Sequence, residues 1–339
     1  MGSLWQDIRY ALRMMAKTPA LTAVLAITLA LGIGASTTIF SVVNSVVLRP
    51  LPYEQPDRIV RVYTEFLGPS PHRKFWFSIP ELMELTRDCR SCALVGGWVR
   101  GSAPLAGGDR PVRVAVAYST HQLLPLLGVS PVLGRWFDAS EDRPQPPTPG
   151  QIVGEPSVVV ISYDVWQRAF GGDKRIIGRK VELDAIPVTV IGVMPKGFDF
   201  LDGIEAWVPG HFDPALPRRA SHVAHVVVRL APGATLASLN EELASLNKEW
   251  GKRDTDGFHS ISDAEHPMMA VPFQADLVGS LATTLWLLQG AVLFVLLISI
   301  VNVANLLLAR AETRTREVAV RHALGASRQI GRASCRERV

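Results

Sequence analysis

The chain has 339 residues, of which 48% are hydrophobic and 19% are charged, and its formal net charge is +4. The charge is unevenly placed: residues 1–17 carry +2 and the residues from Arg310 onward carry +5, so −3 is left for everything between. Because nucleic-acid binding needs a basic patch on the folded domain, this distribution excludes nucleic acid as a partner and instead suits anionic membrane lipids at both ends.

Residues 1–48 are predicted to form an interfacial helix followed by the first transmembrane helix. Apolar and basic side chains recur at roughly helical spacing over 1–17, which predicts a cytoplasmic amphipathic elbow helix. Residues 18–48 carry no charge and predict transmembrane helix 1, since the apolar core of a cleaved signal peptide is only about 7–15 residues long. Gly32, Gly34, Ala35 and Ser36 are either small residues for close helix packing or ordinary membrane-helix composition, and both interpretations stay open.

Residues 49–276 predict an extracytoplasmic domain that mixes helices and strands. Hydrophobic alternation between turn residues indicates strands, and apolar residues at helical spacing indicate helices. The expected strands are 58–64, 95–105, 111–117, 157–161, a hairpin over 180–193 that turns near Asp184 and Ala185, 222–230 and 268–273. The expected helices are 78–87 with Ser78 as its cap, 121–127, 164–170 and the stripe Leu236, Leu239, Leu243, Leu246 and Trp250.

Residues 277–309 predict transmembrane helix 2. The stretch from Leu281 to Ala309 is uncharged and exceeds the roughly 20 apolar residues that span a bilayer. Asn302 and Asn305 lie inside it and either join helices by hydrogen bonds or mark a polar pathway, of which helix packing is favoured. Because basic residues precede the first span and follow the second, both termini are predicted to be cytoplasmic and the domain periplasmic.

The second span passes directly into a basic coupling segment at 310–330. Arg314, Arg321 and Arg328 recur at intervals of seven and would share one helix face. Glu317 precedes Arg321 by four residues, which is the favourable order for a helical ion pair. The segment is either a flank that only sets orientation or a helix that lies at the inner membrane surface and offers a docking face.

The sequence EVAVRHALGASR at 317–328 resembles the cytoplasmic coupling segment of ABC-transporter permeases of the MacB/FtsX type. NVANLLLAR (302–310), residues 7–44 and FGGDKRIIGRKVELDAIPVTVIGVMPKGF (170–198) are also similar to this group, and to its acidobacterial-type large permeases in particular. The residues that fit the coupling motif, and that the resemblance implies as contacts for a partner ATPase, are Arg316, Glu317, Arg321, Ala323, Leu324, Gly325, Ala326 and Ser327.

The resemblance implies an α+β membrane protein in which two long transmembrane helices flank a large extracytoplasmic mixed α/β domain. Residues 50–92 and 212–276 would form a membrane-proximal α/β part, and residues 93–211 an inserted, mostly β subdomain. Permeases of this type carry at least two further membrane helices after the coupling segment. The polar, arginine-rich residues 331–339 are atypical of the group, so we expect a truncated permease with a foreign tail.

The resemblance also implies a function: the permease subunit of a mechanotransmission-type ABC transporter in the bacterial inner membrane. A separate ABC ATPase would bind ATP and push the coupling segment, and movement of the external domain would drive export or efflux. Further implied partners are a second copy of the chain, in a homodimer, and a periplasmic adaptor or outer-membrane component. The alternative is a membrane-anchored binding or sensing module without active transport.

Few residues suggest other chemistry. Cys89 and Cys92 form a CxxC that follows a helix and precedes a strand, the reverse of a thioredoxin-like site, so a structural disulfide and two unpaired thiols are the open alternatives. His222 and His225 would point to opposite faces of one strand, and no Cys or carboxylate set is expected to complete a metal site. The sequence has no phosphate-binding loop or nucleophile motif, so we expect neither an enzyme nor a cofactor.

Overall fold

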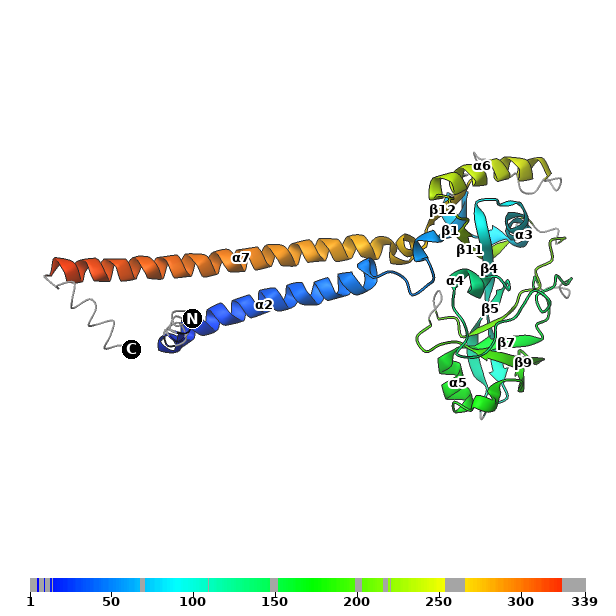
Figure 1. The fold of residues 1–339 in the computed structure, drawn as a ribbon, viewed down its shortest axis with the longest axis horizontal. Helices are drawn as coiled ribbons and strands as arrows, with labels where there is room; N and C mark the ends of the chain where they lie inside the picture. The colour runs from blue at the N-terminus through cyan, green and yellow to red at the C-terminus, as the bar shows by residue number, and fades with distance from the viewer. Residues whose placement is uncertain are drawn as a thin grey trace. The chain divides into compact units, whose positions relative to one another are not determined.

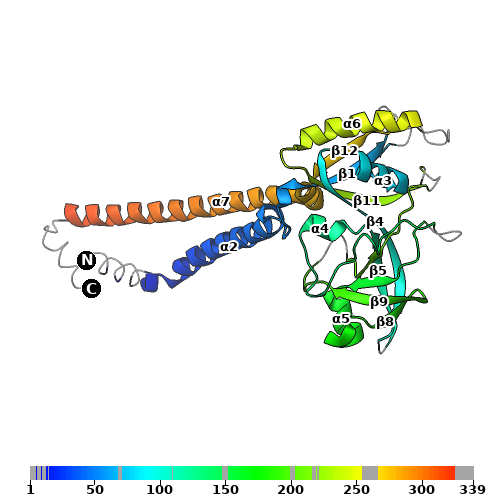
Figure 2. The same ribbon diagram turned by 45° about the vertical axis from the view of Figure 1, so that its right-hand side comes forward.

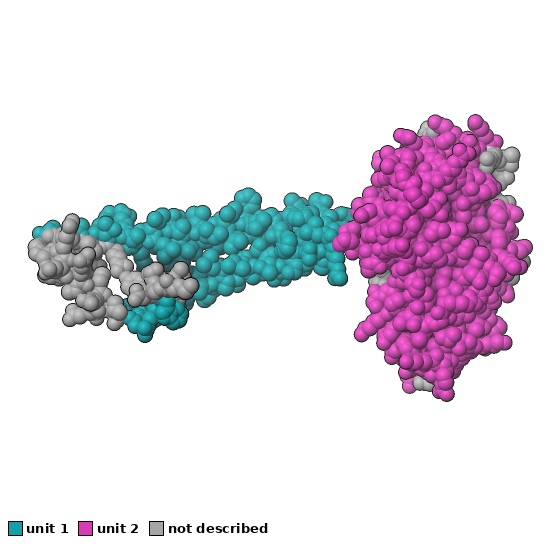
Figure 3. Space-filling model, viewed as in Figure 1, with its two compact units in different colours: residues 1–49, 278–339 teal, residues 50–277 magenta. Residues whose placement is uncertain are grey.

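The computed structural model describes residues 5, 9, 13, 15–67, 71–108, 110–146, 152–198, 203–215, 219, 221–253 and 266–324. The chain forms two compact units, one of residues 1–49 and 278–339 and the other of residues 50–277 (Figure 3). Most of the elbow helix predicted at 1–17 and all of the tail at 331–339 lie outside the described residues, so both stay predictions.

The first unit contains two long helices, α2 (Pro19–Val43) and α7 (Phe273–Ala323) from Val278 onward, which run side by side (Figures 1 and 2). A π-helical turn, Asn44–Leu48, continues α2. Thr22–Leu48 and Leu281–Thr313 have mean hydropathies of 2.0 and 2.6 and are long and apolar enough to cross a membrane. The basic residues of α7 begin at Arg310, within the same helix.

Small and polar side chains bring α2 and α7 together. A Cβ atom on Gly32 would lie 2.9 Å from Leu296 Cδ1, so glycine permits this close approach, whereas Gly34 has no such neighbour within 4 Å. Gln289 Nε2 donates to Ser36 Oγ at 3.4 Å. Of the small residues of α2, Gly32 and Ser36 therefore take part in helix packing.

Asn302 and Asn305 line a hollow between the same two helices, opposite Val24, Leu25 and Thr28 of α2. Both amides are exposed within this unit. Their position on the α2-facing side of α7 is compatible with either interpretation that the sequence left open.

One mixed sheet runs through residues 50–277, in the order β12-β1-β11-β4-β5-β10-β7-β9-β6 among the described residues. Most pairs are antiparallel, but β10 pairs in parallel with β5, and β7 with β9. The strands are β1 Ile59–Phe66, β2 His72–Phe75, β3 Phe77–Ser78, β4 Cys92–Ala106, β5 Val112–Ser119, β6 Leu133–Gly134, β7 Val158–Ile161, β8 Lys180–Leu183, β9 Ile186–Val193, β10 Ala206–Pro209, β11 His222–Leu230 and β12 Met268–Pro272.

Within the described part of this unit, four shorter helices pack on the sheet: α3 (Ile79–Asp88), α4 (Leu123–Leu127), α5 (Tyr163–Phe170) and α6 (Leu236–Arg253), with 3₁₀ turns at Pro56–Arg58 and Lys174–Ile176. Local signals fix their ends. Ser78 and Glu81 form a reciprocal capping box at the start of α3. Gly128 and Gly171 end α4 and α5 in left-handed conformations that favour glycine.

The buried side chains form three clusters. The first joins α3 and α6 to β1, β4, β11 and β12, and the predicted stripe of α6 supplies its Leu239, Leu243 and Trp250. The second lies under α5 between β5, β7 and β9. The third surrounds α4 and contains Trp98 and Trp207. Each cluster buries the apolar face of one or two helices against the sheet, which is the main stabilising contribution.

Most elements agree with the sequence-based expectations, with two corrections. The last strand ends at Pro272 rather than Phe273, because Phe273 is fully buried and begins α7. The strands β2, β3, β6 and β10 are not predicted, since segments of two to four residues are too short to show alternation. Strand β4 pairs with both β11 and β5, so the sheet is continuous near residue 93, and the subdomain at 93–211 stays a prediction.

Candidate functional site

Of the predicted coupling residues, Arg316, Glu317, Arg321 and Ala323 lie at the far end of α7. The helix has helical backbone from Leu281 to Ala323, and its single non-helical residue is Gly279, with φ 48° and ψ −134°. The basic segment continues α7 without a break between Arg310 and Ala323. Whether it only sets orientation or offers a docking face at the inner membrane surface stays a prediction. From Leu281 to Ala323 one continuous helix joins the apolar span and the basic segment, and Gly279 separates it from the first turn of α7 in the domain.

The described side chains of this segment are exposed. Arg316 Nη2 lies 3.4 Å from Glu312 Oε1, one turn earlier, which supports the helix weakly. Leu324 is 83% exposed, more than any other large hydrophobic residue that the structure describes. Glu317 and Arg321 lie on the helix but their side chains are not described, and Gly325, Ala326 and Ser327 lie outside the described residues.

The first turn of α7 is held in the second unit by a buried carboxylate. Asp276, whose side chain is 4% exposed, accepts hydrogen bonds from Tyr63 Oη of β1 at 2.5 Å and from Lys74 Nζ of β2 at 2.8 Å. Arg61 Nη1 lies 3.6 Å from the same carboxylate. Burial and the hydrogen bond to Asp276 raise the pKa of Tyr63, which keeps the phenol protonated as a donor.

His225 extends this polar cluster inward. Its Nδ1 lies 3.0 Å from Arg61 Nη2, and because a guanidinium only donates, this nitrogen carries no proton. Its ring stacks on the buried Trp98, with centroids 5.0 Å apart and 16° between the planes. Burial and the positive charges of Arg61 and Arg100 lower the pKa of His225 to about 4. His225 is therefore neutral at physiological pH.

His222 lies in a second, separate cluster. Its Nε2 lies 3.1 Å from His266 Nε2 and 3.4 Å from Glu81 Oε2, and His266 Nε2 lies 3.6 Å from Glu81 Oε1. The side chains of all three residues are at most 3% exposed. His222 and His225 thus lie in different clusters, and the structure places a carboxylate and a second histidine beside His222 that no sequence motif indicated. One donor atom from each of Glu81, His222 and His266 lies within 4.8 Å of the others, so the three side chains could hold a metal ion.

The three side chains of this cluster come from elements that are distant in sequence. Glu81 is fixed by the capping box of α3, where its Oε2 accepts from both the backbone nitrogen and the hydroxyl of Ser78 at 2.8 Å. His222 begins β11 and pairs with Ser78 of β3. His266 precedes β12, and its carbonyl accepts from Asn247 of α6 at 2.9 Å. Sequence reasoning missed Glu81 and His266 because no local spacing relates them to His222.

Glu81 is a buried carboxylate held by two histidines. Burial alone would raise the pKa of Glu81, but hydrogen bonds to His222 and His266 outweigh it and hold the pKa well below its ordinary value. The carboxylate is therefore ionised although it is only 1% exposed. A buried anion needs hydrogen bonds, a paired cation or a metal ion beside it.

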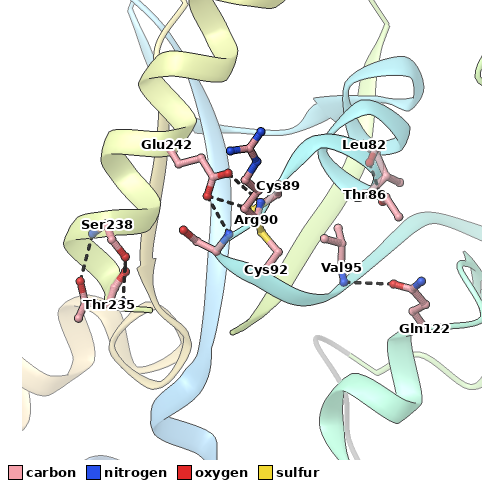
Figure 4. Close-up of a disulfide and its surroundings, with 11 residues drawn as sticks. Leu82, Thr86, Cys89, Arg90, Cys92, Val95, Gln122, Thr235, Ser238 and Glu242 are labelled. Atoms are coloured by element: carbon pink, nitrogen blue, oxygen red, sulfur yellow. Dashed lines mark hydrogen bonds between the residues drawn. A yellow bond between two sulfur atoms is a disulfide. The ribbon is translucent and has the colours of Figure 1, made fainter. Parts of the chain in front are cut away.

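Cys89 and Cys92 form a disulfide in the turn between α3 and β4, which decides between the two alternatives that the sequence left open. Figure 4 shows Glu242 of α6 beside this turn, where its carboxylate accepts from the backbone nitrogens of Arg90 at 2.7 Å and Ser91 at 2.8 Å. The bridge and Glu242 together tie α3, β4 and α6, so the CxxC has a structural role.

Comparison with known protein families shows the family of this chain. The family described as the MacB-like periplasmic core domain matches residues 22–246. The chain belongs to this family. The match includes most of α2 and of the second unit, and among the residues that the structure describes no catalytic domain is evident beside the MacB-like domain.

Individual relatives of this MacB-like chain are distant. The macrolide export ATP-binding/permease protein MacB 1 of Yersinia pestis bv. Antiqua is 23% identical over 252 residues, which cover 71% of this chain and 36% of the relative. MacB of Neisseria gonorrhoeae is 26% identical over 211 residues, which cover 61% of this chain and 30% of the relative. The chain thus spans about a third of the length of these relatives.

Solved structures are similar to parts of the MacB-like chain. The periplasmic region of MacB from Actinobacillus actinomycetemcomitans is 14% identical, with a TM-score of 0.45, covering 62% of this chain and 88% of the other. The extracellular domain of the ABC-type transporter YknZ from Gram-positive bacteria is 15% identical, with a TM-score of 0.42, covering 62% of this chain and 99% of the other.

Proposed function

We propose that the chain is part of the permease subunit of a mechanotransmission-type ABC transporter. Both termini lie in the cytoplasm, residues 49–276 lie outside it, and a separate ABC ATPase docks on residues 316–327. ATP-driven movement of that partner pushes on α7, and the external domain changes shape to drive export or efflux. The family match and the two apolar helices that flank the domain support this proposal.

The observation that carries the proposal is the continuity of α7. The helix leaves β12, contains the apolar span and reaches the basic coupling motif with helical backbone from Leu281 to Ala323. Because each helical residue is tied to the fourth residue before it, an uninterrupted helix transmits axial displacement over its length, whereas a loop would absorb it. The buried ion pairs of Asp276 hold the first turn of α7, which precedes Gly279, against β1 and β2.

Leu324 is the apolar anchor that a partner would cover. Fully burying a leucine side chain contributes about 1.5–3 kcal/mol, and placing an unpaired carboxylate in the same pocket costs more. We therefore expect Leu324→Asp to lower the amount of ABC ATPase that co-purifies with the chain by roughly 100-fold, as about 2.7 kcal/mol corresponds to that ratio.

The measurement is affinity capture of the tagged chain from detergent-solubilised membranes of the source cells, followed by mass spectrometry. Leu67→Asp, a change of the same kind at a 40% exposed leucine of the second unit, is the matched control and should capture as much ATPase as the wild type. If the wild type captures no nucleotide-binding subunit, the membrane-anchored binding or sensing module becomes the better proposal.

A further inference from the structure

We propose that Glu81, His222 and His266 form a binding site for one divalent transition-metal ion, of which Zn²⁺ fits best. The transporter proposal does not use these residues. Two imidazoles and one carboxylate are a donor set that zinc takes in proteins, with three protein ligands and one further position. The site would be structural, because it lies inside the second unit with all three side chains almost fully buried.

The spacing of the donor atoms matches tetrahedral coordination. With metal–ligand distances near 2.0–2.1 Å, two ligands of a tetrahedral zinc ion lie about 3.3 Å apart. The two Nε2 atoms are 3.1 Å apart, His222 Nε2 lies 3.4 Å from Glu81 Oε2, and His266 Nε2 lies 3.6 Å from Glu81 Oε1. A cation at the centre of these atoms needs shifts of a few tenths of an ångström, which buried side chains tolerate.

The hydrogen-bond partners orient the donors correctly. His266 Nδ1 lies 2.8 Å from the carbonyl oxygen of Glu65, and because a carbonyl only accepts, this nitrogen carries the proton. With the proton on Nδ1, the lone pair of a neutral ring lies on Nε2, which faces the cluster. A histidine held by a backbone carbonyl through its other nitrogen is the usual outer-shell arrangement of a metal ligand.

Glu81 is prepared in the same way. Ser78 occupies Oε2 with two hydrogen bonds, which fixes the carboxylate plane and leaves Oε1 directed toward His266. A carboxylate ligand offsets part of the charge of a buried divalent cation. Phe66 stacks on His266, with centroids 4.3 Å apart, and meets His222 edge-on at 4.9 Å, so an aromatic ring covers the cluster.

The competing interpretation is a hydrogen-bonded cluster without metal, in which one proton lies between the two Nε2 atoms. Such a cluster gives the two Nε2 atoms a hydrogen bond to each other, but the negative charge of the buried carboxylate is neutralised only if one histidine is also protonated. A bound cation satisfies both nitrogen lone pairs and the carboxylate together, which is why the geometry favours it.

A metal ion at this site would stabilise the fold of the second unit. His266 directly precedes β12, whose other end passes into the first turn of α7. A metal ion there would join the start of α3, the start of β11 and the start of β12. Because the ligands are far apart in sequence, binding of the ion stabilises the folded state and not the unfolded chain.

The test uses the full chain in detergent, purified without a polyhistidine tag and stripped with a chelator. Titration with Zn²⁺, followed by calorimetry, should give one ion per chain and a raised Tm, and Co²⁺ should give the visible absorption of a tetrahedral site with nitrogen and oxygen ligands. Glu81→Gln and His222→Gln should each weaken Zn²⁺ binding by at least about 100-fold. The control His121→Gln, at a partly exposed histidine beside Asp142, should change neither stoichiometry nor affinity.

The wild-type Co²⁺ spectrum keeps the proposal testable even if a variant does not fold. No binding by the wild-type chain, or binding that Glu81→Gln and His222→Gln leave at full strength while both variants are folded, would overturn the metal site. In the first case the hydrogen-bonded cluster is the correct account.

Discussion

Asp276→Ala is expected to lower the free energy of unfolding by about 3 kcal/mol, because removing one partner of a buried ion pair leaves the others uncompensated. Asp276 is the carboxylate on which Tyr63, Lys74 and Arg61 converge. Arg61 is only 13% exposed at its side chain, so water cannot fully replace the lost anion, whereas Lys74 at 46% can turn outward. Chemical denaturation of the detergent-solubilised chain, followed by tryptophan fluorescence, measures the loss.

One further variant separates charge from hydrogen bonding at Asp276, and a second serves as a control elsewhere in the unit. Asp276→Asn keeps an acceptor for Tyr63 but loses the negative charge, so its effect should fall between those of the wild type and Asp276→Ala. Asp57→Ala removes an exposed aspartate of the same unit and should change stability by no more than about 0.5 kcal/mol. Equal effects of Asp276→Ala and Asp57→Ala would show that the cluster does not hold the first turn of α7.

A second large effect is expected from acidification through His225. Its pKa is about 4 in the folded chain and about 6.5 when unfolded. Below pH 6.5 the unfolded state binds a proton that the folded state does not, so stability falls as the pH falls. The stabilising contribution is complete above pH 6.5, and the loss reaches on the order of 2 kcal/mol at pH 5 and 3 kcal/mol at pH 4.

His225→Gln isolates this contribution from the carboxylates, which also titrate in acid. Glutamine can accept from Arg61 but does not titrate, so the stability of the variant should depend less on pH between 6.5 and 4. The measured quantity is the difference in unfolding free energy between wild type and variant at each pH. A difference that stays constant over this range would contradict a neutral His225 beside Arg61 and Trp98.

Helical periodicity, capping residues and turn residues predicted those elements that a single short segment of sequence determines. The stripe of α6 is buried at Leu239, Leu243 and Trp250, and Ser78 caps α3 as its position before Pro80 suggests. Asp184 and Ala185 both have positive φ at the predicted hairpin turn. In each case the periodicity or turn chemistry of a few neighbouring residues decides the conformation.

The Glu81, His222 and His266 cluster could not be predicted in this way. It depends on two strand pairings across long separations: Ser78 opposite His222, and Thr64 opposite Met268. Because register between distant strands is set by the whole buried face, no short motif around residue 81, 222 or 266 contains it. The same reason explains why Asp276 could not be assigned to Tyr63 and Lys74 from sequence.

The central claim is that α2 and α7 connect a domain on one side of the membrane to a coupling segment on the other. Labelling with a membrane-impermeant maleimide tests it directly, in a Cys335→Ser background and with single cysteines introduced at two exposed alanines, Ala139→Cys in the second unit and Ala311→Cys at the end of the apolar span. The account predicts that right-side-out vesicles label only the Ala139→Cys chain and that inside-out vesicles label only the Ala311→Cys chain. Labelling of both chains in the same vesicles would contradict it.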